Sequence, residues 1–125
     1  MLSDYVKSAD WQNEKHVPVI ECKDFKPGEP LNIFVTVGKG IPHQNTPAHH
    51  ICWIALHFVP QGAKASIELA RCEFSAHGAS AGEQPGPALT DSVLAVTARL
   101  AVPGKLFATS YCNIHGLWSS EKDLA

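Results

Sequence analysis

The stretch Ser110-Tyr-Cys-Asn-Ile-His-Gly-Leu-Trp118 is the part of the sequence around which the rest of the chain can be organised. Its Cys112 and His115 are three residues apart, a spacing at which the chain can turn and bring both side chains to one metal ion. One thiolate and one imidazole only half fill a coordination sphere, so other ligands must come from elsewhere. Six of the seven histidines lie upstream. These features predict one metal site assembled from three separated loops.

The chain has 125 residues, and a folded chain of that length buries roughly two thirds of the surface it exposes when unfolded. We therefore expect a single domain over residues 1–125, with one core and a short N-terminal arm. The formal net charge is -2, and charged residues make up 18% of the chain. Such a chain has no basic surface of the kind that holds nucleic acid or an anionic membrane, so neither is expected as a partner.

No segment has the pattern of a membrane span or a signal peptide. The longest apolar run, residues 93–102, is interrupted by Thr97 and Arg99 and falls far short of the ~20 residues that cross a bilayer. The first residues, Met1 to Asp4, lack the charged and then apolar pattern of a signal sequence. The expected location is the cytoplasm.

The four cysteines could form two disulfides in an oxidising compartment, but in the cytoplasm we expect them to remain thiols. Three of them, Cys22, Cys52 and Cys72, lie in apolar segments that resemble strands. A free cysteine in such a segment behaves as a small core residue. Only Cys112 has surroundings typical of a metal ligand.

Apolar segments separated by turn residues predict β-strands along most of the chain. Residues 31–37 show the alternating pattern of a half-buried strand, because every second residue from Leu31 to Val37 is aliphatic. Residues 51–59 are apolar on both faces except at His57, as in a central strand covered on both sides. The predicted strands are residues 17–22, 31–37, 51–59, 66–74, 92–101 and 105–111.

The segments between these strands are rich in turn residues or polar. We expect an arm with one short turn over residues 1–13, a long surface loop over 75–89, a hairpin joining 92–101 to 105–111, and a loose tail over 119–125. No segment carries a helical period. Short strands with turns at intervals of roughly ten residues predict an all-β fold, an immunoglobulin-like antiparallel β-sandwich of about seven strands.

Two histidines, His43 and His49, lie in one Pro-rich loop just before a predicted strand. Two imidazoles in one loop suit a metal site better than isolated ones, because the loop can present both to the same ion. His50 is the alternative to His49, but it points the opposite way if Ile51 begins a strand. Spacing therefore favours His49.

His16 follows Glu14 and Lys15, so a carboxylate and an ammonium stand beside its imidazole. This combination suggests a reaction site more than a packed core. His57 lies in a predicted strand, and His77 lies in a loop of glycine and serine with no second ligand nearby. We predict that these two are structural or surface residues.

Taken together, these segments resemble superoxide reductase of the one-iron neelaredoxin type, the family of the desulfoferrodoxin iron-binding domain. The resemblance rests on Glu-Lys-His-Val-Pro at 14–18, Pro-His-x5-His-His-Ile at 42–51, Trp-Ile at 53–54, Ala-His-Gly-Ala-Ser at 76–80 and Tyr-Cys-Asn-Ile-His-Gly-Leu-Trp at 111–118. It covers most of the chain. Each segment alone is a weak signal, but their order and internal spacing make the resemblance specific.

The resemblance implies a mononuclear iron on an immunoglobulin-like sandwich, with the sixth coordination position open in the ferrous form. The implied ligands are four equatorial imidazoles and one axial thiolate: His16, His43, His49, His115 and Cys112. Four neutral imidazoles and one thiolate around ferrous iron give a net charge near +1 and an electron-rich axis. Such a site can bind and reduce a small anionic oxidant.

The resemblance also implies roles for the two residues before His16. A carboxylate at the position of Glu14 can occupy the sixth position in the ferric form, and a lysine at the position of Lys15 attracts the anion and helps to supply protons. The implied reaction is one-electron reduction of superoxide to hydrogen peroxide, with rubredoxin as the external electron donor. We also expect a homo-oligomer, either a tetramer or a dimer.

Two other classes of protein remain as alternatives. A cupredoxin-like electron carrier is also a β-sandwich with late Cys and His ligands, but its copper site usually takes an axial Met after the last His, and the only Met here is Met1. A structural zinc site in a binding module would normally close with four ligands and not five.

Overall fold

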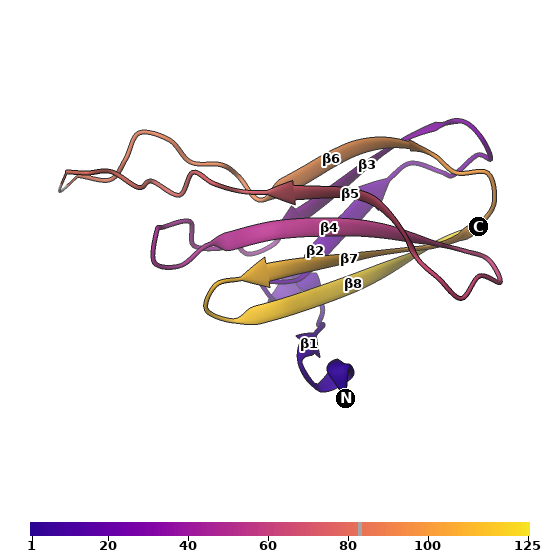
Figure 1. Ribbon diagram of the computed structural model, residues 1–125, viewed down its shortest axis with the longest axis horizontal. Coiled ribbons are helices and arrows are strands. Elements are labelled where there is room, and N and C mark those ends of the chain that lie inside the picture. Colours follow the sequence, from indigo (N-terminus) through magenta and orange to yellow (C-terminus); the bar gives the residue numbers. More distant parts are fainter. Residues whose placement is uncertain (83) are drawn as a thin grey trace.

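The computed structural model describes residues 1–82 and 84–125 of the chain, and it shows two β-sheets packed face to face (Figure 1). The larger sheet has the strand order β1 (Val6–Lys7), β8 (Gly116–Leu124), β7 (Gly104–Cys112), β4 (Ile51–Pro60) and β5 (Ile67–Glu73). The smaller sheet has the order β2 (Pro18–Cys22), β3 (Pro30–Val37) and β6 (Val93–Arg99). The predicted all-β, immunoglobulin-like sandwich is confirmed.

The core lies between the two sheets and follows directly from the sequence pattern. In β3 the residues Leu31, Ile33, Val35 and Val37 are buried, whereas the residues between them are exposed or half-buried, as the alternation predicts. Ile33 of the small sheet and Leu56 and Leu106 of the large one are 0% exposed. Burying such side chains contributes roughly 1.5–3 kcal/mol each to folding, so this layer holds the sheets together.

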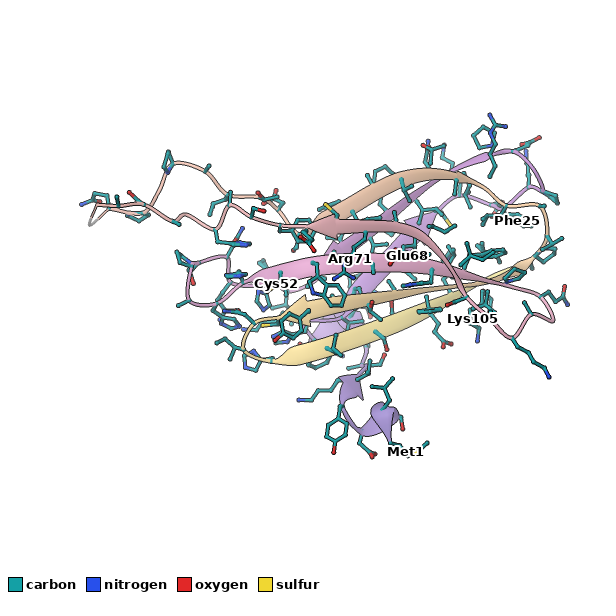
Figure 2. The ribbon with its side chains drawn as sticks, viewed as in Figure 1. Met1, Phe25, Cys52, Glu68, Arg71 and Lys105 are labelled. Carbon is teal, nitrogen blue, oxygen red and sulfur yellow. The ribbon has the colours of Figure 1, made fainter. Side chains whose placement is uncertain are left out.

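The central strand β4 pairs with β5 on one side and β7 on the other. Its outer face was predicted to be covered, and it is half-buried by side chains of its own sheet. The ring of Trp53 stacks on Tyr111, with ring centroids 6.0 Å apart, and the guanidinium of Arg71 (labelled in Figure 2) lies 4.2 Å from the Trp53 ring. His57 stacks on Phe107 at 4.7 Å. Aromatic and cationic side chains thus cover the outer face of β4, where no further sheet or helix packs in the described residues.

Two predictions about the C-terminal half were wrong. Residues 119–125 do not form a loose tail, because β8 runs to Leu124 and pairs with β7 along its whole length. Residues 92–101 and 105–111 do not form a hairpin, because β6 pairs with β3 in the small sheet and β7 lies in the large one. The polar residues of β8 resemble a loose tail, and the Pro-Gly turn resembles the turn of a hairpin. Neither local pattern reveals which sheet a strand joins.

The N-terminal arm is also more ordered than predicted. It contains two 3₁₀ turns, Leu2–Asp4 and Trp11–Asn13, and the short strand β1, which pairs in parallel with β8. This is an exception to the predicted antiparallel arrangement. The segment 75–89 is irregular in its described residues, as predicted, and carries one isolated bridge between His77 and Leu89. In the described residues no helix is both long and apolar enough to cross a membrane.

Candidate metal centre

Three segments far apart in the sequence meet at one end of the sandwich, which we call the ligand end. They are residues 14–16 before β2, the connector 38–50 between β3 and β4, and the turn 113–115 between β7 and β8. In Figure 1 the connector and the turn lie together at the left of the view. The predicted ligands therefore stand on loops supported by both sheets.

A tight turn brings His115 back toward Cys112. The pairing of β7 with β8 continues until Cys112 lies opposite Gly116, which leaves a loop of three residues. Gly116 has a φ of +81°, in the left-handed region that glycine adopts without strain and that closes hairpins of this length. As a result, Nδ1 of His115 lies 3.8 Å from Sγ of Cys112.

The connector is fixed at both of its ends. Gly38 has a φ of +88°, and a Cβ at this position would lie 2.9 Å from the backbone nitrogen of His43, so a side chain here would force a shift. At the other end the backbone N–H of His50 donates to Oδ1 of Asn113 at 2.9 Å. The connector is thus tied to the turn that carries the cysteine and the last histidine.

His16 is held by the large sheet although it precedes a strand of the small one. The hydroxyl of the buried Ser110 donates to the carbonyl oxygen of His16 at 3.2 Å. The His16 ring stacks on Trp118 of β8, with ring centroids 4.9 Å apart and planes at 13°. The pairing of β1 with β8 places Lys7 opposite Trp118, with its ammonium 5.7 Å from the Trp ring. The C-terminal strand that the sequence did not reveal therefore supports a candidate ligand.

The five residues proposed as ligands come together at the ligand end. The donor atoms of His16, His43, His49 and Cys112 all lie within 4.8 Å of one another. His115 adjoins them, with its Nδ1 3.1 Å from Nε2 of His16. Metal bonds to nitrogen and sulfur are roughly 2.0–2.3 Å long, so ligands on opposite sides of one ion lie up to roughly 4.6 Å apart. The cluster therefore has about the size of one coordination sphere.

The Nδ1 hydrogen bonds of His16 and His43 leave Nε2 of each ring facing the other candidate ligands. Nδ1 of His16 donates to Oε1 of Glu14 at 2.5 Å, and Nδ1 of His43 donates to the carbonyl of Gln44 at 2.6 Å. Nε2 of His49 is buried and has no hydrogen-bond partner among the described residues. Such an unpaired nitrogen is unfavourable, and a bound cation would pair it. The residues present therefore fit a metal ion.

Electrostatics favour the protonation states that bind a metal. Burial, opposed by the hydrogen bond to Gln44 and assisted by the nearby His16, His49 and Lys15, lowers the pKa of His43 to about 4. Burial likewise lowers the pKa of His16 and that of His49. Neutral imidazoles are the form that coordinates a cation, so these rings can bind one without first losing protons near neutral pH.

Glu14 and Lys15 lie at the edge of the cluster. Oε1 of Glu14 accepts hydrogen bonds from the backbone nitrogen of His16 at 2.8 Å and from its ring. Burial alone would raise the pKa of Glu14, but these bonds outweigh it and lower the pKa. Lys15 donates to Oε1 of Gln44 at 2.7 Å, which places its ammonium beside the connector. Sequence reasoning did not foresee that the Glu14 carboxylate orients the ring of His16.

The remaining histidines lie outside the cluster. His50 turns away from it and stacks on His77, with ring centroids 3.6 Å apart. His77 is 8% exposed, and His57 lies in the middle of β4. The cysteines Cys22, Cys52 and Cys72 are half-buried and free, and Cys22 and Cys72 pack against the core.

Sequence reasoning missed the supporting roles of Asn113 and Trp118, although both lie in the stretch that carries Cys112. An amide directly after the cysteine and an aromatic residue three positions after His115 were the available signals. Their partners, His50 and His16, are distant in the sequence. Only the folded arrangement reveals these contacts.

The sequence matches known proteins over nearly its whole length. The family model described as Desulfoferrodoxin matches residues 8–121. The chain is 44% identical to the neelaredoxin of Megalodesulfovibrio gigas, with 99% of this chain and 97% of that protein covered. It is 45% identical to the superoxide reductase of Pyrococcus furiosus, with 99% of each chain covered.

Solved structures agree with these matches. The superoxide reductase (neelaredoxin) of Archaeoglobus fulgidus in its reduced form superimposes with a TM-score of 0.88 at 47% identity, and the match covers 97% of this chain and 98% of that one. The same two-sheet architecture and the same length are therefore shared by relatives with closely similar sequences. On this ground the chain belongs to the desulfoferrodoxin family.

Proposed function

We propose that this protein is a superoxide reductase, which passes one electron from a mononuclear non-haem iron to superoxide and releases hydrogen peroxide. The observation that carries the proposal is the gathering of four histidines and one cysteine at the ligand end of a chain of this family. Relatives with 44–45% identity that carry the name superoxide reductase support the same activity.

The proposed centre holds one iron per chain through the four imidazoles of His16, His43, His49 and His115 and the thiolate of Cys112. Iron bound there would supply the electron, changing from Fe²⁺ to Fe³⁺. The soft thiolate and the imidazoles suit iron. Because the ligand set contributes one negative charge, the reduced centre keeps a net charge near +1 and favours the approach of an anion.

Superoxide takes up one electron and two protons to become hydrogen peroxide, and no bond between its oxygens is broken. We assign to Lys15 the attraction of the anion and help with proton supply. Its ammonium donates to Gln44 and is held beside the connector that bears His43 and His49. The protein has a net charge of -2, so a local cation matters for the encounter.

We assign two functions to Glu14. In the conformation described it accepts hydrogen bonds from His16 and so fixes the tautomer and the direction of that ring, as outer-shell carboxylates do for other metal-binding histidines. With iron bound, its carboxylate could also serve as a further ligand once the product has left. That second function requires its hydrogen bond to the His16 ring to break, so the two functions alternate.

The proposal includes the surroundings of the reaction. We propose that residues 1–125 act as one iron-binding domain, that the protein works in the cytoplasm as a homo-oligomer, and that rubredoxin restores the ferrous state. The free thiols of Cys22, Cys52 and Cys72 are those expected in a reducing compartment. Rubredoxin follows from the family resemblance and awaits a binding measurement.

Neither alternative suits the ligand end as well. A cupredoxin-like carrier needs a weak axial ligand such as Met, but Met1 is 91% exposed on the N-terminal arm. A structural zinc site closes with four ligands, whereas five donor residues meet here. The geometry therefore favours an iron centre with one open position.

The direct test is the yield of hydrogen peroxide when the ferrous protein meets superoxide without oxygen. Reduction gives one peroxide for each superoxide consumed, whereas dismutation gives one for every two. We expect about one iron per chain by metal analysis and the higher yield until the ferrous protein is used up. A protein that carries copper or zinc after expression in iron-rich medium, or that yields only the dismutation ratio, would overturn the proposal.

A further inference from the structure

His77 occupies a position that the proposed chemistry does not use. It lies at the start of the long loop 75–89, yet its side chain is buried and 8% exposed. Its backbone is anchored to the body of the protein, because the N–H of Thr90 donates to the carbonyl of Ala76 at 2.7 Å and His77 forms a bridge with Leu89. The ring thus projects from a fixed support.

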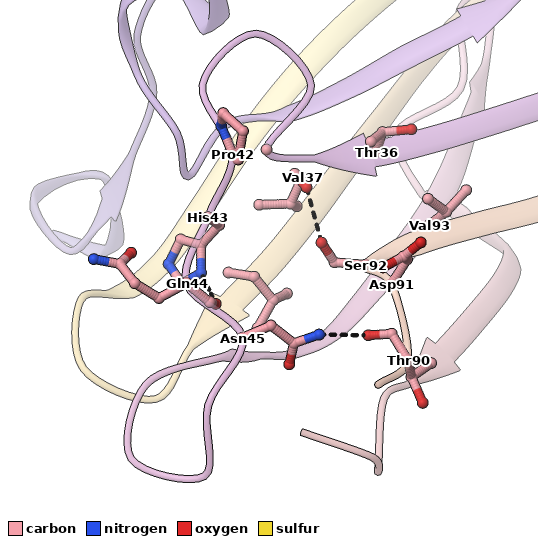
Figure 3. A pocket seen from close by; sticks show the side chains of 12 residues that line it. Thr36, Val37, Pro42, His43, Gln44, Asn45, Thr90, Asp91, Ser92 and Val93 are labelled. Carbon is pink, nitrogen blue, oxygen red and sulfur yellow. Dashed lines mark hydrogen bonds between the residues drawn. The ribbon is translucent and has the colours of Figure 1, made fainter. Parts of the chain in front are cut away.

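Both ring nitrogens of His77 lie within hydrogen-bond distance of an oxygen acceptor. Nε2 lies 2.8 Å from the carbonyl oxygen of Phe74, a residue of 5% exposure. Nδ1 lies 2.7 Å from Oδ1 of Asn45, whose own amide nitrogen donates to the carbonyl of Thr90 at 3.1 Å (Figure 3). The bond to Thr90 fixes which atom of the amide faces His77. The oxygen therefore faces the ring, and a neutral imidazole, which carries one N–H, can donate to only one of these two oxygens at a time.

The face of the same ring supports a second residue of the connector. His77 and His50 are parallel within 6°, with centroids 3.6 Å apart, which is close stacking. Asn45 stands two residues after His43, and His50 follows His49 directly. One buried side chain therefore contacts the connector next to each of its two proposed ligands.

The connector has another support on its far side. Asn113 accepts from the backbone of His50 at 2.9 Å and donates to the carbonyl of Ala48 at 2.9 Å. Asn113 thus holds only the C-terminal part of the connector. The part that carries His43 is anchored by the side chain of Gln44, which accepts from Lys15, and by that of Asn45, which contacts Thr90 and His77.

We propose that His77 is a positioning residue of the metal centre, which holds His43 and His49 in place through Asn45 and His50. The inference shares one assumption with the proposed function, namely that the cluster binds iron. It does not depend on the reaction with superoxide. Loss of an outer-shell partner typically weakens metal affinity about 10–100-fold, which sets the size of the expected effect.

Three variants separate the contributions. His77→Phe keeps a flat ring against His50 and removes both ring nitrogens, whereas His77→Asn can place an amide N–H near the former Nδ1 and restore a bond to Asn45. His57→Phe is the control, because His57 is a half-buried histidine that likewise stacks on an aromatic ring but lies in the middle of β4. Circular dichroism establishes that each variant folds.

The measurements are the rate of iron loss to a chelator, the position of the visible band of the ferric protein, and hydrogen exchange of residues 43–50 in the metal-free protein. We expect His77→Phe to release iron about 10–100-fold faster, to shift the band and to speed exchange in the connector. His77→Asn should recover most of these changes, and His57→Phe should show none.

A purely structural role gives a different result. If His77→Phe lowers the unfolding midpoint but keeps the iron release rate, band and exchange of wild type, the inference is wrong. Hydrogen exchange in the metal-free protein measures the order of the connector directly, so this result does not depend on which metal the protein binds. If the wild type holds iron but fails to reduce superoxide, the proposed function fails while the role of His77 stands on these measurements.

Discussion

The interior of the sandwich and its ligand end differ in whether other protein groups supply all the contacts that their side chains need. Between the sheets Ile33, Leu56 and Leu106 are fully buried against other apolar groups, and nothing is missing from their surroundings. At the ligand end the imidazoles crowd together, with ring centroids of His16 and His43 4.8 Å apart, and the buried Nε2 of His49 has no partner among the described residues.

This difference separates the interactions that stabilise the fold from those that form the candidate metal site. The apolar layer between the sheets supplies the favourable free energy that holds them together. The ligand end is instead a set of donors held by its supports, Ser110 behind His16 and Asn113 behind the connector. We therefore expect changes in the two regions to affect different measurements, stability for the interior and the metal centre for the ligand end.

The largest expected effect is at Cys112. A thiolate bound to ferric iron gives a low-energy charge-transfer band and hence a blue protein, and Cys112 is the only cysteine in the cluster. Cys112→Ser should abolish this band completely while the β-sheet signal in circular dichroism remains. Cys52→Ser, at the neighbouring half-buried thiol at the start of β4 (Figure 2), is the control and should keep the colour. Loss of colour in the control with iron still bound would identify the wrong sulfur.

The interior should respond in the opposite way. Leu56→Ala removes a fully buried side chain from β4 and should lower the free energy of unfolding by about 2–5 kcal/mol, through lost burial and the cavity left behind. Ile67→Ala, at a position 52% exposed, should change it by less than about 0.5 kcal/mol. Urea unfolding measures both. If Leu56→Ala also shifts the visible band of the iron-loaded protein, the two regions are coupled and the comparison fails.

The interior was also the region that the sequence predicted best. Alternation in residues 31–37 placed Leu31 and Val35 in the core, because strand periodicity is a local property. Which sheet a strand joins is not a local property, which is why β6 and β7 were joined as a hairpin. The residues from Ser119 to Asp123 were taken for a loose tail because they are polar, although they pair with the preceding strand β7 across a three-residue loop.

At the ligand end the sequence identified donors better than their supports. The motifs singled out His16 and Cys112 because metal ligands have characteristic residue types and spacing. The contacts of His77 with Asn45 and His50 join residues 27 to 32 positions apart, and no motif encodes them. A loop histidine among glycine and serine was therefore interpreted as structural or surface, without the role in the connector.

The adjacent pair His49 and His50 tests how finely the ligand end is arranged. His49 presents a buried, unpaired nitrogen, whereas His50 donates from Nδ1 to the carbonyl of Thr46 at 2.9 Å and faces His77. His49→Ala should therefore lower iron affinity by more than the ~10–100-fold typical of an outer-shell partner. His50→Ala should stay within that range and keep the visible band. Chelator competition measures both, and the reverse order would reassign the ligand.

The smallest effect concerns a charge at each end of the molecule. Lys15 lies at the ligand end, whereas Lys105 stands at the start of β7, at the opposite end of the strand from Cys112, and its ammonium is 3.0 Å from Glu121 (Figure 2). The hydrogen bond and charge of Glu121 raise the pKa of Lys105, so Lys105 is a cation at neutral pH. Replacing either one by alanine changes the net charge equally.

Position should nevertheless decide the outcome. A unit charge several ångströms from an anion in water contributes about 1 kcal/mol or less, so Lys15→Ala should slow the second-order reaction with superoxide by roughly 2- to 5-fold at low ionic strength. Salt at about 0.1 M screens charges beyond ~10 Å, so the variant should also show a flatter salt dependence than wild type. Lys105 lies too far from the centre to act by steering, so Lys105→Ala should match the wild-type rate.

Pulse-generated superoxide with fast optical detection measures the rates of all three proteins. Equal slowing in both variants would show that net charge alone governs the encounter, and no slowing in Lys15→Ala would leave Lys15 as a surface charge without a role in the approach.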